Sequence, residues 1–208
     1  MITKERTLRI DDILTRKQIT LQVMLDDVAS SQNISAIIRS CDGVGVLNFY
    51  YASKENVDSK IHKTITQGTH RWMNRERIVY ENRVEFLKEK QAQGFQIVVT
   101  HLEEKSIAFS KVDYTKPTVL VMGNEKEGTS QEVLALADEI IIIPMLGMAQ
   151  SLNVSVATGL ILYEAQRQLD EAGHYEKPQL SKEQREEIKK EWIYRDTIRH
   201  RSKGKIFY

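Results

Sequence analysis

The chain has 208 residues, of which 41% are hydrophobic and 28% charged, and its formal net charge is +1. This length can bury the core of one sizeable domain with short attachments, and the composition is ordinary for a soluble globular protein. No apolar run approaches the roughly 20 residues that span a bilayer, and the N-terminal stretch is charged where a signal peptide would be apolar, so we expect a cytoplasmic protein without membrane contact.

Short runs rich in apolar and β-branched residues recur along the chain and predict strands buried on both faces. These runs are residues 21–24, 44–51, 96–100, 118–122 and 140–143. Helical patterns lie between them at residues 33–41, 84–93 and 130–137, with Gly94 as a C-cap and Ser130 as an N-cap. This alternation predicts an α/β fold, a parallel sheet with helices on both faces.

The longest apolar helical pattern covers residues 154–168. Its predicted buried face consists of residues at helical spacing, namely Val156, Ala157, Leu160, Ile161 and Ala165. Beyond Pro178, Ser181 and Gln184 form a capping-box pattern that opens a last helix, on which Ile188 and Trp192 could dock on the core or on a partner chain. We therefore divide the chain into an N-terminal helical extension (1–17), a central domain (18–172) and a C-terminal helical, basic extension (178–208).

Basic residues gather at both ends of the chain, although the net charge is near zero. They are Lys4, Arg6, Arg9, Arg16 and Lys17 in the opening segment, and Arg195, Arg199, Arg201, Lys203 and Lys205 in the closing segment. Such ends are either solvated tails or arms that bind phosphates.

Cys41 is the only cysteine. One thiol can form neither an intramolecular disulfide nor a thiolate zinc site. We therefore expect Cys41 to be a small, half-buried apolar residue and no metal to be bound.

Two segments at strand ends carry residues that packing alone does not explain. In residues 33–45, Asn33 and Arg39 bracket an apolar helical turn, and a helix N-cap would explain Asn33 but not Arg39. In residues 121–130, Gly123 and Gly128 bracket a loop that suits the close approach of a nucleotide-like ligand. Its spacing is neither the dinucleotide fingerprint nor the Walker loop, which disfavours a dehydrogenase or a simple ATP enzyme.

A third segment, residues 140–159, runs from a strand through Pro144 into the longest helix. Ser151 and Asn153 stand at the mouth of that helix, and either could serve as its N-cap without a catalytic role. Met145 and Met148 favour core packing, because methionine readily fills gaps. Ligands of open α/β sheets bind beyond the carboxyl ends of the strands, so the three segments together form the candidate site.

Taken in order, the three segments resemble the motifs of the SpoU class of RNA ribose 2′-O-methyltransferases, in the SPOUT superfamily. They are most similar to the members that methylate guanosine 18 in the tRNA D-loop. The similarity also covers GTHRWM (68–73), VDYTKPT (112–118), ALAD (135–138) and LYEAQRQ (162–168), and thus nearly the whole chain.

This resemblance changes the expected fold. Periodicity alone predicts an unknotted doubly wound sheet, because threaded chains are essentially absent among proteins. The resemblance implies a Rossmann-like SPOUT domain in which residues from about 118 to 168 form a deep trefoil knot that holds S-adenosylmethionine (SAM). It also implies a homodimer with active sites at the subunit interface, which agrees with an apolar final helix that exceeds what one domain covers.

The resemblance assigns roles residue by residue. It implies a catalytic site made of Arg39, Asn33, Glu125, Ser151 and Asn153, and SAM contacts from backbone near Thr100, Gly123, Ile143, Met145 and Leu152. The implied reaction is SAM-dependent methylation of the ribose 2′-hydroxyl of guanosine 18, with tRNA as the partner. Because a guanidinium keeps its proton at any ordinary pH, we expect Arg39 to bind the neighbouring RNA phosphate while the phosphate or a water takes the hydroxyl proton.

Two other interpretations remain open. The chain could be a 2′-O-methyltransferase that acts on rRNA or on another tRNA position. It could also be an RNA-binding relative that kept the fold and lost catalysis, although the presence of Arg39, Glu125 and Asn153 speaks against this.

Overall fold

The computed structural model describes residues 3–54 and 61–203, except for the side chains of residues 63 and 198–203. In this part of the chain the centre is a seven-stranded parallel sheet in the order β3-β2-β1-β6-β4-β7-β5. The strands are β1 (Leu21–Asp26), β2 (Asn48–Ala52), β3 (Asn74–Ile78), β4 (Gln96–Thr100), β5 (Ile107–Ala108), β6 (Thr118–Gly123) and β7 (Glu139–Ile142). The chain winds outward from β1 towards β3 and then returns to build the other half from β4 to β7, as in a doubly wound sheet.

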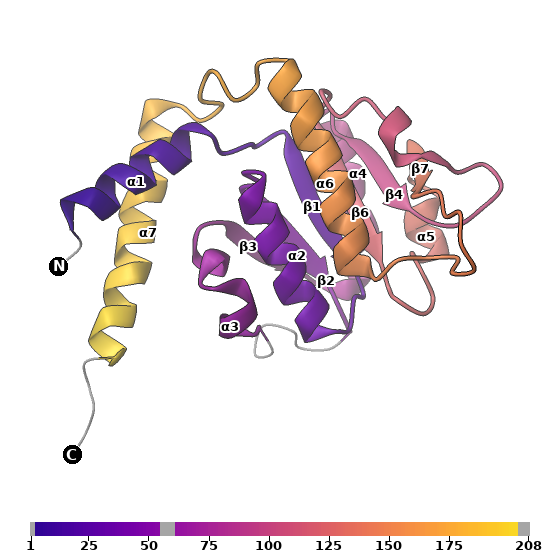
Figure 1. Cartoon of the computed structure of the whole chain (residues 1–208), viewed down its shortest axis with the longest axis horizontal. Coiled ribbons are helices and arrows are strands. Elements are labelled where there is room, and N and C mark those ends of the chain that lie inside the picture. The colour runs from indigo at the N-terminus through magenta and orange to yellow at the C-terminus, as the bar shows by residue number, and fades with distance from the viewer. Residues whose placement is uncertain (1–2, 55–60, 204–208) are drawn as a thin grey trace.

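Helices cover both faces of this sheet (Figure 1). They are α1 (Lys4–Thr15), α2 (Ser31–Gly43), α3 (Lys63–Thr66), α4 (Arg83–Ala92), α5 (Gln131–Leu134), α6 (Val154–Glu171) and α7 (Lys182–Lys203). α2 and α6 pack on one face and α4 and α5 on the other, whereas α1 and α7 pair beside the sheet. The α/β class and the layered arrangement predicted from the sequence are confirmed.

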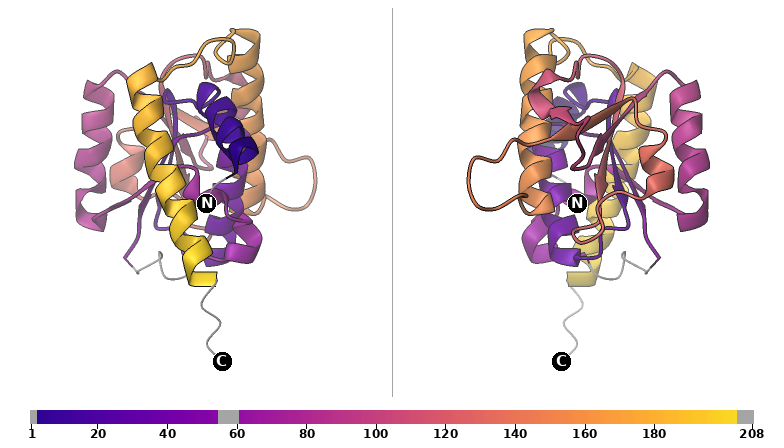
Figure 2. Two further views of the ribbon diagram at one scale, coloured as in Figure 1. Left: turned by 90° about the vertical axis from the view of Figure 1, so that its left-hand side faces the viewer. Right: turned by 90° about the vertical axis from the view of Figure 1, so that its right-hand side faces the viewer.

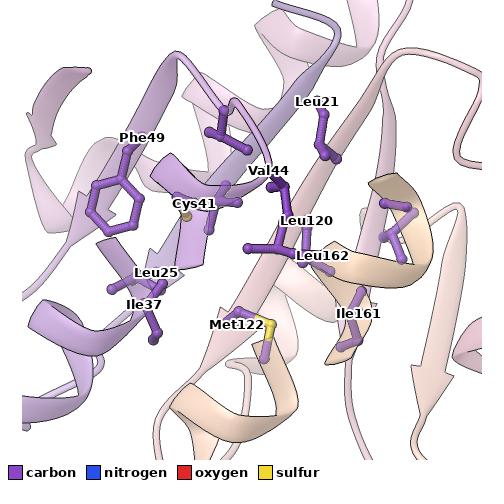
Figure 3. Close-up of a cluster of buried hydrophobic side chains, with 14 of the residues drawn as sticks. Leu21, Leu25, Ile37, Cys41, Val44, Phe49, Leu120, Met122, Ile161 and Leu162 are labelled. Carbon is purple, nitrogen blue, oxygen red and sulfur yellow. The ribbon is translucent and has the colours of Figure 1, made fainter. Parts of the chain in front are cut away.

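Two apolar clusters fill the layers between the sheet and the helices. Neighbouring strand residues enter different clusters, because side chains alternate across a strand: Leu25 faces α2 and α6, whereas Met24 faces α4. Figure 3 shows the larger cluster, in which Ile37 and Ile161 meet the strands. Cys41 belongs to this cluster and is fully buried, so the expectation that it is half-buried was wrong.

α1 and α7 form a third apolar cluster together with Leu47, Trp72 and Leu180, and the left view of Figure 2 shows the two helices next to each other in front of the sheet. Trp192 is fully buried and meets Trp72 edge-on, with 5.5 Å between the ring centroids. Asp196 accepts a hydrogen bond of 2.8 Å from Nε of Arg6, and Ile188 packs on the same cluster. Of the two placements left open for Ile188 and Trp192, the structure shows docking on the core of the same chain.

Several predicted boundaries shift in the structure. The strand predicted at residues 44–51 begins at Asn48, because Gly45 adopts φ +83° and turns the chain just before it. β3 and β5 were missed: β3 has the charged sequence NRERI at one edge of the sheet, and β5 has two residues. The capping box of α7 is confirmed, since the backbone N–H of Ser181 donates to Gln184 and that of Gln184 to Ser181 Oγ.

The predicted buried face of α6 is partly wrong. Ile161 and Ala165 are buried, but Val156 and Leu160 are 51% and 46% exposed. The buried stripe lies to one side of the predicted one and includes Thr158. Apolar residues thus remain uncovered on the outer side of a core helix.

Two predictions about the long-range organisation stay predictions. The knot expected between residues 118 and 168 would involve β6, α5, β7, the loop after β7 and α6. The division at residues 17/18 and 172/178 also stays a prediction, although α1 and α7 from the two extensions lie against each other. Among the described residues, no helix combines the length and apolarity that a bilayer crossing requires.

Candidate functional site

The loops that follow β4, β6 and β7 surround a cavity of about 1040 Å³ at the carboxyl edge of the sheet. Parallel strands all present their carboxyl ends at the same edge, so segments far apart in sequence meet there. The loop between β7 and α6 projects beside the cavity as an open arc (Figure 2). Two of the three motif segments identified in the sequence line this cavity, and the third lies next to it.

Three polar side chains join the three motif segments. Asn33 of α2 donates from Nδ2 to Oε1 of Glu125, at 2.7 Å. Asn153 donates from Nδ2 to Oδ1 of Asn33, at 3.1 Å. Glu125 and Asn153 line the cavity, so these two hydrogen bonds lie at its mouth.

Helix capping decides the orientation of these residues. Ser30 caps α2 by accepting from the backbone N–H of Asn33, at 3.3 Å, so the alternative that Asn33 is the N-cap is wrong. Asn153 is the N-cap of α6 and accepts from the backbone N–H of Ser155 at 2.8 Å. Its Oδ1 therefore holds the helix while its Nδ2 reaches Asn33. Ser151, the other candidate cap, lines the cavity and is exposed.

The position of Glu125 depends on a neighbour that the sequence analysis did not single out. Asn124 donates from Nδ2 to the backbone carbonyl of Asp27 at 2.7 Å, and its Oδ1 accepts from the backbone N–H of Lys126 at 2.8 Å. Asp27 itself has φ +58°, an unusual conformation for a non-glycine residue. Asn124 thus ties the turn that carries Glu125 to the end of β1. An asparagine after a strand fits many turns, so the pattern gave no sign of this partner.

The glycines of this loop accommodate the protein's own backbone. A Cβ on Gly123 would collide with the backbone of Gly128 and Thr129, and Gly128 has φ +71° beneath the ring of His101. Both positions need glycine, as predicted. The atoms that approach them closely belong to the protein itself, however, and not to a ligand. His101 also lines the cavity.

All the residues expected to hold SAM line the cavity: Thr100, Gly123, Ile143, Met145 and Leu152. In the loop before α6, the backbone groups of residues 145–152 make no hydrogen bond with any described residue. Unpaired backbone donors and acceptors beside apolar walls are what a nucleoside-like ligand requires. Met148 is fully exposed, so its predicted role in core packing was wrong, whereas Met145 is half-buried at the cavity.

Arg39 stands apart from the polar cluster. It lies on α2 six residues beyond Asn33, which is about 9 Å along a helix axis. Its side chain is exposed, it does not line the cavity, and it makes no hydrogen bond or ion pair with a described residue. Within a single chain, the structure therefore does not bring Arg39 to the other predicted catalytic residues.

Several basic residues of the chain ends serve the fold. Lys17 is buried, with its ammonium 3.0 Å from Oδ1 of Asp42, and burial lowers the pKa of Lys17. Arg6 pairs with Asp196, and Arg195 donates to two backbone carbonyls. For these three residues the expectation of a phosphate-binding or solvated role was wrong. The side chains of Arg199, Arg201, Lys203 and Lys205 lie outside the described part of the chain.

The fold and the cavity define a class: α/β proteins that receive a nucleoside-like ligand in irregular loops at the carboxyl ends of parallel strands. Residues 20–163 match the family model described as the SpoU rRNA Methylase family. The chain is 50% identical, over 98% of its length and 95% of the relative, to the "tRNA (guanosine(18)-2'-O)-methyltransferase" of Aquifex aeolicus. This chain belongs to the SpoU methylase family, as its motifs predicted.

Solved structures agree with this assignment. The A. aeolicus TrmH/SpoU tRNA modifying enzyme superposes with a TM-score of 0.89 at 51% identity, over 93% of this chain and 97% of that one. The AdoMet-bound rRNA methyltransferase of Sinorhizobium meliloti superposes with a TM-score of 0.65 at 32% identity, over 77% of this chain and 60% of that one. The SPOUT architecture predicted from the sequence is therefore confirmed.

Proposed function

We propose that this chain transfers a methyl group from SAM to the ribose 2′-hydroxyl of guanosine 18 in the D-loop of tRNA, in the cytoplasm. One observation carries the proposal: Asn33, Glu125 and Asn153, from three separate segments, converge at the mouth of the motif cavity. Glu125 and Asn153 are exposed and Asn33 is half-buried, so the network contributes little to stability and is better explained by ligand binding. The relative that is 50% identical carries the name of this reaction.

The cavity suits SAM in both shape and chemistry. A volume of about 1040 Å³ accommodates a nucleoside with an amino-acid arm. Residues 145–152 would bind the adenine and ribose through backbone groups that have no partner in the described chain. Apolar Ile141 and Leu152 line the same space. When bound, SAM supplies an electrophilic methyl group.

The polar cluster would align the acceptor. Methyl transfer to a hydroxyl is an in-line displacement, so the protein gains most by fixing the angle and distance of approach. Asn33 is held on two sides, by Glu125 and by Asn153. This leaves the cluster with few rotamers and lets it position the ribose, with the carboxylate of Glu125 available to accept a hydrogen bond from a nucleotide hydroxyl or amine.

Arg39 would bind the phosphate next to the target ribose. A guanidinium fork matches phosphate oxygens bidentately and stabilises the alkoxide that develops as the 2′-hydroxyl loses its proton to the phosphate or to a water. The side chain is exposed and without a partner among the described residues, as a phosphate ligand should be before RNA binds.

We also propose a homodimer that completes each site across its interface. Val156, Leu160 and Tyr163 lie exposed on α6, 51%, 46% and 57% respectively, on the helix that begins at the cavity. A second copy would cover this apolar strip. It would also bring Arg39 to the cavity of the partner subunit, which accounts for the distance between Arg39 and the cluster within one chain.

The proposed reaction is tested with a tRNA transcript and labelled SAM. We expect one methyl group per tRNA, mapped to guanosine 18 as an alkali-resistant ribose. A synthetic tRNA with 2′-deoxyguanosine at position 18 is the matched control and should accept none. Methylation of that control, or of another nucleotide in the natural tRNA, would overturn the assignment of guanosine 18 as the target.

An rRNA substrate is the second candidate, because the S. meliloti rRNA methyltransferase shares the fold. The same assay with a 23S rRNA transcript distinguishes the two. If rRNA is methylated and tRNA is not, the substrate assignment is wrong while the chemistry stands.

A further inference from the structure

A second cavity, of about 470 Å³, lies between α7 and the amino-terminal edge of the sheet. Its walls include Gln22, Asn48 and Asn74, which stand at the starts of β1, β2 and β3. The cavity is therefore at the end of the strands opposite to the motif cavity. None of the roles assigned above uses it.

Three carboxamide side chains form the floor of this cavity in one row. Val23 pairs with Phe49, which sets Gln22 beside Asn48, and Asn48 pairs with Asn74. Residues paired across neighbouring strands point to the same face of a sheet. Apolar residues usually pack at such a place, because burying a polar group costs free energy unless it is hydrogen-bonded. The stability of the core therefore does not explain three neighbouring amides.

The row leaves hydrogen-bonding capacity unused. Gln22 is 4% exposed; its Nε2 donates to the backbone carbonyl of Ile19 at 3.0 Å, while its buried Oε1 has no partner. Asn74 donates to Oδ1 of Asn48 at 3.1 Å, so Nδ2 of Asn48 is left without a partner among the described residues. A buried acceptor and a neighbouring donor are thus unused, and native proteins rarely leave buried polar groups unpaired.

The other walls indicate the kind of ligand. Phe95 and Ile188 provide apolar surface, and Glu187 of α7 is the acid among the described lining residues, which include no lysine or arginine. An acid without a compensating base disfavours phosphate. A flat, uncharged ligand with a hydrogen-bond donor beside an acceptor satisfies the amides and the apolar walls together.

We propose that this cavity binds the adenine base of a nucleoside. Adenine offers an amino donor next to a ring-nitrogen acceptor, the pattern that asparagine and glutamine amides read in nucleic acids. Gln22 Oε1 would accept from the amino group and Asn48 Nδ2 would donate to the ring nitrogen. The ribose would extend towards Glu187 and solvent.

The test is titration of the full chain with adenosine, followed by calorimetry or ligand-observed NMR. The protein is first saturated with S-adenosylhomocysteine, so that adenosine cannot enter the motif cavity. We expect a dissociation constant below about 1 mM, as for a small ligand in a preformed pocket. Guanosine, which presents a donor where adenine presents its ring acceptor, should bind at least about tenfold more weakly.

Gln22→Met removes the buried acceptor while nearly keeping the shape of the side chain. We expect about tenfold weaker adenosine binding with only a small change in Tm, because loss of the unpaired acceptor offsets loss of the hydrogen bond from Nε2 to the carbonyl of Ile19. Gln93→Met, at an exposed position outside the cavity, is the matched control and should bind as the parent does. Should Gln22→Met fail to fold, Asn48→Asp replaces it, because the carboxylate presents an acceptor where Nδ2 would donate to the ring nitrogen, and adenosine binding should again weaken about tenfold.

The source of the base is decided by adding tRNA. If tRNA displaces adenosine, the site takes a nucleotide extruded from tRNA; if both bind together, it takes a free nucleoside. Either result supports the site. No adenosine binding at several millimolar, or binding that Gln22→Met leaves unchanged, would overturn the proposal without touching the methylation assay, which needs no second cavity.

Discussion

Mixing two inactive variants tests whether each site is shared between subunits. Arg39→Ala removes a residue outside the motif cavity, and Glu125→Ala removes one inside it. Each alone should lose about 10²-fold or more in turnover, as when one transition-state contact is removed. If Arg39 acts in the partner subunit's cavity, a mixed dimer has one site with both residues and one with neither.

The expected gain follows from counting sites. After free exchange of equal amounts of the two chains, half of the dimers are mixed, and half of their sites are intact, so about a quarter of parental activity should return. Labelled methyl transfer to tRNA measures the activity, and native mass spectrometry verifies that mixed dimers form.

A matched pair of variants serves as the control. Glu125 and Asn153 line the same cavity and are joined through Asn33 within one chain. Mixing Glu125→Ala with Asn153→Ala leaves a defect in every site and should restore nothing. If mixed dimers form from Arg39→Ala and Glu125→Ala chains without any gain in activity, the shared site is refuted.

Four further outcomes are expected. Arg39→Lys keeps the charge but loses the planar fork, so SAM binding measured by calorimetry should persist while most turnover is lost; near-normal turnover contradicts the phosphate role. Removal of residues 198–208, which spares the buried Trp192, should weaken tRNA binding and flatten its salt dependence in filter-binding assays, and an unchanged slope argues against a basic arm. Leu160→Asp on the exposed strip of α6 should shift sedimentation from dimer to monomer with little change in Tm, and a persistent dimer places the interface elsewhere. Burial raises the pKa of the Cys41 thiol, so iodoacetamide should label it only after denaturation, and labelling of the native protein at neutral pH would show that this core opens.

The sequence predicted the buried strands well, because a strand covered on both faces must be apolar along its whole length. It could not find β3, whose residues are mostly polar or charged and half exposed, since an edge strand looks like a loop in composition. The face of α6 was misjudged for a related reason. Both Leu160 and Ile161 are apolar, and periodicity cannot show which of the two faces the sheet and which remains exposed.

Candidate site residues were predicted from motifs, whereas their arrangement depends on contacts that motifs do not contain. Asn33 looked like a helix cap, but its own backbone N–H donates to Ser30 Oγ, which makes Ser30 the cap. The hydrogen bond from the Asn33 side chain to Glu125, 92 residues away, could not be predicted from the motif. Too many basic residues were assigned to RNA binding, because their ion-pair partners are distant in the sequence. Lys17 has its partner in Asp42, 25 residues away, which the local sequence does not reveal.

The proposed dimer would explain both the exposed strip of α6 and the isolated position of Arg39. An apolar strip on a core helix costs solubility unless something covers it, and an arginine without a partner gains nothing for the fold. Both features lie on the helices that pack together on one face of the sheet, α6 and α2. A second copy placed on that face would cover the strip and supply the guanidinium in a single step. Loss of the dimer should therefore abolish turnover even when every residue of the motif cavity is intact.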